Sequence, residues 1–183
     1  MIMQQPTSGP VPVSKVQPFI GLDQSFNVAV NHIANKLNPR GWTVLPGEEY
    51  DERTGGCYQT LDDFRGAVHH EGRMIVNADY SDPELTIWGC RKTNYAFRAW
   101  HDWHRLKRNA PFDLDGEIAV ANSQARDLIN LYGVATSGPW RKLLEAEVIG
   151  QARYMAYHGQ FPTGQKGFAI HRLVGGSISR VFH

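Results

Sequence analysis

Three polar side chains interrupt the apolar face of the helix that the sequence predicts from Pro139 to His158. At about 100° per residue, Glu147, Gln151 and His158 project from the same broad face as Trp140. A carboxylate, an amide and an imidazole that face a core must find partners or give up their charge. These side chains are therefore the first candidates for chemistry in the chain.

A second predicted helix, from Asp115 to Tyr132, carries the same pair of groups. Glu117 and Gln124 are spaced by seven residues and lie within its apolar half. We expect Gln124 to belong to a buried polar network together with Gln151.

The preceding helix, Asn94 to about Arg108, adds two imidazoles. His101 and His104 are three residues apart, which is close enough for both to bind one ion. His104 lies at the edge of the apolar face, and His101 lies in the polar arc with Arg98.

Imidazoles and carboxylates drawn from three adjacent helices are the means by which helical bundles build metal sites. Such a site would hold zinc or another divalent metal, with a glutamate as general base on bound water. Antiparallel connections place the imidazoles and Glu117 at one level, whereas Glu147 lies about 16 Å further along its helix and is expected to pair with Gln124. The predicted metal ligands are His101, His104 and His158, and the predicted catalytic residues are Glu117 and Glu147.

The alternative is a buried polar network without metal. Glu147 would then pair with Arg98, or Glu117 with His104. An H-x-x-H pair is common by chance, and the absence of an E-x-x-H pair on these helices argues against a di-iron site.

The helices and strands that the sequence predicts around these residues indicate an α+β fold. Three antiparallel helices near residues 94–158 would pack beside a small antiparallel sheet. Its expected strands are Trp42–Leu45, Met74–Asn77 and Leu85–Trp88, with Ser177–Phe182 as a possible fourth, and residues 46–59 are expected to form a loop. Residues 20–183 would form one globular domain.

The first 19 residues carry four prolines, which forbid a regular helix. We expect them to form an extended arm that contacts another chain, either a second copy in a homo-oligomer or a different protein.

The composition excludes some classes of partner. The formal net charge of +1 gives no overall field for nucleic acid or an anionic membrane, and Arg91-Lys92 and Arg105–Arg108 are interpreted as a solvated face. No run approaches 18 apolar residues, the start has no signal-peptide pattern, and the two cysteines form no framework. We therefore expect a cytoplasmic protein without membrane or nucleic-acid partners.

The segments F-R-A-W-H-D-W-H (97–104) and F-D-L-D-G-E (112–117) carry a resemblance. They resemble a motif, F-R-A-x-H-D-x-x-x-H followed by F-x-x-x-G-E, of uncharacterised tailed-phage and prophage proteins, over roughly residues 85–125. The second histidine here follows after three positions and not after the longer step of the motif. The resemblance implies that His101, Asp102 and Glu117 form a polar centre and that the protein comes from a phage.

Two functional classes follow from these patterns. The first is a small metal-dependent hydrolase of phage type with a His/Glu pocket between helices. The second is a non-enzymatic phage protein, either a virion component or a host-factor-binding protein, in which the polar network is structural. The phage context would place either one in the host cytoplasm or the virion.

Overall fold

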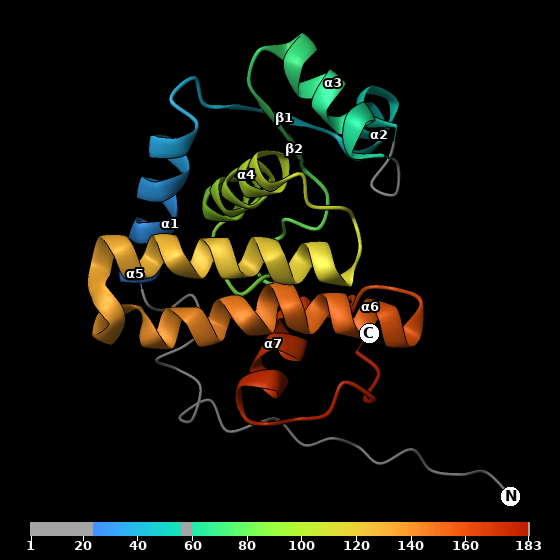
Figure 1. Ribbon diagram of the computed structural model, residues 1–183. Helices are drawn as coiled ribbons and strands as arrows, with labels where there is room; N and C mark the ends of the chain where they lie inside the picture. Colours follow the sequence, from blue (N-terminus) through green and yellow to red (C-terminus); the bar gives the residue numbers. More distant parts are fainter. Residues whose placement is uncertain (1–23, 56–59, 183) are drawn as a thin grey trace, which may run out of the picture.

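The computed structural model describes residues 24–55 and 60–182, so the predicted arm, residues 1–19, lies outside the described residues (Figure 1). The described chain is mostly helical, with one two-stranded sheet, and is α+β in this broad sense. In chain order the elements are α1 (Gln24–Leu37), β1 (Trp42–Leu45), α2 (Gly47–Thr54), α3 (Leu61–Glu71), β2 (Met74–Asn77), α4 (Arg91–Arg108), α5 (Leu114–Leu144), the π-helical turn η2 (Glu145–Gly150), α6 (Gln151–His158) and α7 (Gln165–Leu173).

The sheet is parallel, so the prediction of an antiparallel sheet was wrong. β1 and β2 pair in register from Trp42 with Met74 to Leu45 with Asn77. Parallel neighbours need a long crossover, and α2 and α3 supply it. The segment 46–59 was predicted as a loop, but its described part contains α2 and is therefore largely helical.

Two other predicted strands are not strands. Leu85–Trp88 forms turns, and the described residues from Ser177 to Phe182 are irregular. The apolar character of the first segment has a different cause, because Ile87 and Trp88 are buried in the main core. An apolar run of four residues does not by itself distinguish a strand from a buried turn.

The chain from residue 91 to residue 158 is helical except at short connections. Gly133 has φ 79° and ψ 163°, a backbone conformation that is essentially restricted to glycine, and there α5 reverses direction. The part of α5 after Gly133, with η2 and α6, runs back along the part before it (Figure 1). The helices at 94–158 do not stand alone, because α1 packs against α4 and α7 packs against η2.

Several helix ends follow the local signals in the sequence. Thr60 and Asp63 form a capping box at the start of α3. Gly159 ends α6 in the left-handed conformation with φ 73°. Among the described residues, no helix has the length and apolarity needed to cross a membrane.

The core has two parts, and α4 contributes to both. One part joins α1, α4, α5 and η2 around Trp88, Trp100 and Trp140. The other joins the sheet to α2, α3 and α4 around Phe64 and Ile75. α4 crosses α5 steeply, with α2, α3 and the strands on its other side (Figure 1). Two polar side chains of α4, His101 and Arg105, reach Glu117 in the first turn of α5.

Candidate functional site

Arg105 of α4 is the centre of a buried polar cluster. Only 2% of its surface is exposed. Its Nη1 donates to the carbonyl oxygen of Pro111 at 2.7 Å, and its Nη2 donates to Glu117 Oε1. The same Nη2 lies 2.9 Å from His101 Nε2. The guanidinium carbon also lies 4.5 Å from the centre of the Phe112 ring. One side chain thus ties α4 to the 109–113 connection and to the first turn of α5.

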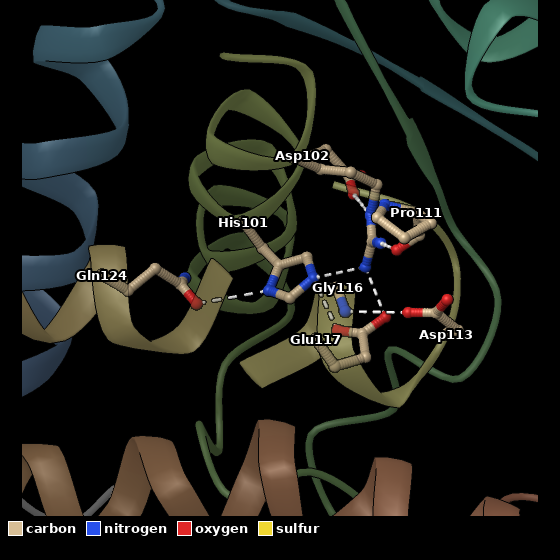
Figure 2. Close-up of polar contacts among 8 residues, drawn as sticks. His101, Asp102, Pro111, Asp113, Gly116, Glu117 and Gln124 are labelled. Atoms are coloured by element: carbon tan, nitrogen blue, oxygen red, sulfur yellow. Dashed lines mark hydrogen bonds and ion pairs between the residues drawn. The ribbon is translucent and has the colours of Figure 1, made fainter. Parts of the chain in front are cut away.

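His101 and Glu117 meet, as the sequence predicted. His101 Nε2 lies 3.1 Å from Glu117 Oε2, and His101 Nδ1 lies 3.2 Å from Gln124 Oε1 (Figure 2). Burial alone would raise the pKa of Glu117, but His101 and Arg105 outweigh it and lower this pKa to about 2. Glu117 is therefore a carboxylate across the whole physiological range and a weak base.

Asp102, the next residue on α4, has the opposite character. Burial raises the pKa of its carboxyl above the usual range, although His101 and Arg105 act against this. Asp102 Oδ1 lies 3.8 Å from Arg105 Nε, an ion-pair distance beyond a hydrogen bond. Two carboxyl groups beside one guanidinium thus differ in their tendency to hold a proton.

His104 does not join this cluster. Its Nε2 lies 2.7 Å from Asp127 Oδ2, which also accepts a hydrogen bond of 2.9 Å from Trp100 Nε1. The i, i+3 spacing from His101 places the imidazole further round α4, against the next turns of α5. The expected shared ion site is therefore not formed by His101 and His104.

His158 is also elsewhere. Its Nε2 lies 2.8 Å from the carbonyl oxygen of Ile178, and its ring centre lies 4.1 Å from that of Tyr154, with the two rings tilted by 35°. His158 was predicted to lie beside Glu117, but its neighbour is the C-terminal segment that follows α7. The predicted convergence of four ligands in one pocket is thus reduced to His101 and Glu117.

Glu147 and Gln151 are buried, with 7% and 8% of their surfaces exposed. Burial raises the pKa of Glu147 to about 7, although Gln151 and the charge of Arg98 lower it. Glu147 Oε2 and Gln151 Nε2 form no hydrogen bond with the described residues, and neither does Nε2 of the expected partner Gln124. The π-helical turn η2 carries Glu147, and such turns are frequent at functional sites.

A cavity of about 530 Å³ opens beside the cluster, within the range of small-molecule sites. Its polar wall includes Asp102, Arg105 and Glu117, and Arg98 lines it as well, donating 2.7 Å to the carbonyl oxygen of Asn77. The rest of the wall is mostly apolar or aromatic and comes from α2, α3, the start of α5, α6 and the residues after α6: Tyr50, Phe64, Phe112, Leu114, Met155 and Phe161.

The residues present do not form the ligand set that zinc requires. Within residues 24–55 and 60–182, no three His, Cys, Asp or Glu side chains are arranged to hold a metal ion. The donors that an ion would share, His101 Nε2 and Glu117, already face the guanidinium of Arg105. The metal site predicted from His101, His104 and His158 therefore lacks support from this geometry.

No protein-family model, curated protein or solved structure matches this chain. The function is therefore inferred from the site alone.

The sequence interpretation did not identify three residues of this region as part of the candidate site. Arg105 was assigned to a solvated face, but it is the most connected side chain of the cluster. Its position four residues after His101, on the same ridge of α4, was the available signal. Arg98, seven residues before Arg105, also faces the cavity. For Asp127, nothing in the sequence distinguished the partner of His104 from an ordinary surface aspartate.

Gly116 supports the cluster by its lack of a side chain. A Cβ at this position would collide with the carbonyl oxygen of Pro111, the acceptor of Arg105 Nη1. We expect Gly116→Ala to displace the 109–113 connection and to destabilise the fold by about 1–3 kcal/mol. Gly138→Ala is the matched control, because a Cβ there meets nothing within 4 Å. In urea unfolding, Gly138→Ala should leave the free energy of unfolding unchanged or raise it by up to about 1 kcal/mol. Equal losses of stability in both variants would contradict the proposed collision with Pro111.

Proposed function

We propose that the cavity between α4, α5 and α6 is the active site of an enzyme that hydrolyses a small substrate by acid–base chemistry. The observation that carries this proposal is the opposite behaviour of two carboxyl groups on one wall. The pKa of Asp102 is raised and that of Glu117 is lowered to about 2, a separation typical of acid–base sites.

Each residue of the wall has a distinct role in the proposed reaction. Water adds to the electrophilic centre, Asp102 gives its proton to the leaving group, and the proton released by the water returns to Asp102. Arg98 and Arg105 stabilise the negative charge that develops on the substrate oxygen. Glu117 holds Arg105 in position, and the aromatic wall binds the apolar body of the substrate. Glu147 lies near Arg98 and is assigned no direct contact with the substrate.

A panel of p-nitrophenyl esters and phosphoesters tests the proposal. Asp102→Asn keeps the shape of the side chain but removes the proton donor, so we expect kcat to fall about 100-fold or more. Asp115→Asn changes an exposed acid of α5 and should leave kcat unchanged. Equal rates in the wild type and Asp102→Asn would overturn the assignment of Asp102.

The alternative is a non-enzymatic protein whose polar cluster is structural, and one observation favours it. Both terminal nitrogens of Arg105 are used inside the protein, by Pro111, Glu117 and His101. This alternative predicts that the wild type turns over no ester or phosphoester of the panel. The phage origin stays a prediction from the motif and does not distinguish the two.

A further inference from the structure

A second hollow lies on another face of α4, where α1, α3 and α4 end. It is a shallow groove of about 460 Å³. Its floor is formed by half-buried or buried apolar side chains from three helices and β2: Leu37, Val68, Met74, Trp103 and Leu106. An apolar floor with a polar rim has the composition of a protein–protein interface.

The rim of the groove is basic. Arg40, Arg73 and Lys107 line it, and no acidic residue does. Arg73 is partly compensated, since its Nε lies 3.6 Å from Glu71 Oε1. Arg40 and Lys107 form no ion pair with any residue in the part of the chain that the structure describes.

The rim is held in place by the fold. Arg40 Nη1 donates 3.0 Å to the carbonyl oxygen of Gly72, which links the end of α1 to the end of α3. Gly72 has φ 74° and caps α3 with its N–H directed at Val68 and His69 carbonyls. The groove therefore exists before any partner binds, which lowers the entropic cost of binding.

We propose that this groove binds an acidic protein segment whose bulky apolar side chain packs on Trp103 and Leu106. Carboxylates flanking that side chain would meet Arg40, Arg73 and Lys107. The groove is more open to solvent than the cavity beside Arg105, so it suits a surface contact with a protein segment better than the enclosure of a small molecule. Its floor is mainly aliphatic with one Trp, whereas single-stranded nucleic acid needs a row of aromatic stacking surfaces. This proposal is independent of the proposed hydrolase.

Fluorescence anisotropy with a fluorescein-labelled peptide, Glu-Asp-Leu-Phe-Asp-Glu, tests the proposal on the full chain. We expect saturable binding that weakens between low salt and 0.5 M salt. Lys107→Glu should weaken it about tenfold, because it replaces an attraction by a repulsion. Lys142→Glu, an exposed cation of α5 outside the groove, is the matched control and should have little effect.

Two further peptides separate charge from apolar contact. Glu-Asp-Ala-Ala-Asp-Glu keeps the charges and Gln-Asn-Leu-Phe-Asn-Gln keeps the apolar pair, and both should bind at least about fivefold more weakly. Binding should also shift the indole N–H resonance of Trp103, identified with Trp103→Phe. The proposal is overturned by no saturable binding up to about 1 mM, by equal binding of the Ala-Ala peptide, or by tighter binding of a single-stranded oligonucleotide.

Discussion

Arg105→Met is expected to destabilise the protein by about 3–5 kcal/mol. Methionine keeps much of the volume and the apolar stem but removes the only guanidinium that contacts Glu117 among the described residues. Glu117 is largely buried, with 23% of its side chain exposed, so its charge would lose one of its two partners and keep only His101. The carbonyl oxygen of Pro111 would lose its donor at the same time.

Urea unfolding at pH 7 measures this loss, and two variants serve as controls. Adding Glu117→Gln to Arg105→Met removes the stranded charge and should restore part of the stability. Arg53→Met breaks only surface ion pairs, those with Glu49 and Glu71, in which 42% of the Arg53 side chain is exposed, and should cost less than about 1 kcal/mol. A loss below about 1 kcal/mol for Arg105→Met would show that the cluster is solvated.

Glu147→Gln is expected to stabilise the protein above pH 7 by about 3 kcal/mol. The folded state holds the Glu147 proton up to a pKa of about 7, whereas the unfolded state releases it near the ordinary value of 4.5. The folded state thus binds more protons between these values, so stability falls as pH rises from about 4.5 to about 7 and is constant beyond. At about 1.4 kcal/mol per pH unit, the fall reaches about 3 kcal/mol. Glu147→Gln abolishes this fall in stability because the glutamine side chain has no proton to lose.

Unfolding free energies at pH 5, 6, 7 and 8 test this expectation. Glu117 does not interfere in this window, because its stabilising charge is lost only as pH falls below about 4.5 toward 2. Glu145→Gln changes an exposed neighbour in η2 and should keep the pH dependence of the wild type. Parallel pH profiles for the wild type and Glu147→Gln would mean that Glu147 is ionised in the folded state at pH 5.

The local features of the fold were predictable because they depend on neighbouring residues. The end of α1 before Pro39, the capping box of Thr60 and the left-handed Gly159 each follow from a few adjacent side chains. Helical periodicity also identified Glu147 and Gln151 as buried, since Trp140 and Leu144 share their face. The meeting of His101 with Glu117 followed from the short connection between their helices.

Pairings between distant segments were decided by the tertiary structure alone. β1 and β2 are parallel because α2 and α3 form a crossover, in a segment whose glycines and proline favoured a loop in the sequence. Similarly, His158 contacts the carbonyl oxygen of Ile178 in the C-terminal segment, and His104 contacts Asp127. The spacing of residues in the sequence indicates neither of these two partners.

The sequence by itself determined which side chains had to find partners, and the steep crossing of α4 over α5 decided which partners they found. That crossing brings His101 and Arg105 to Glu117 in the first turn of α5 and His104 to Asp127 in a later turn. Periodicity fixes the face of a helix on which a residue lies, but the partner opposite depends on the crossing angle and offset of two helices. These are set by the packing of the whole core, which includes α1 and the sheet.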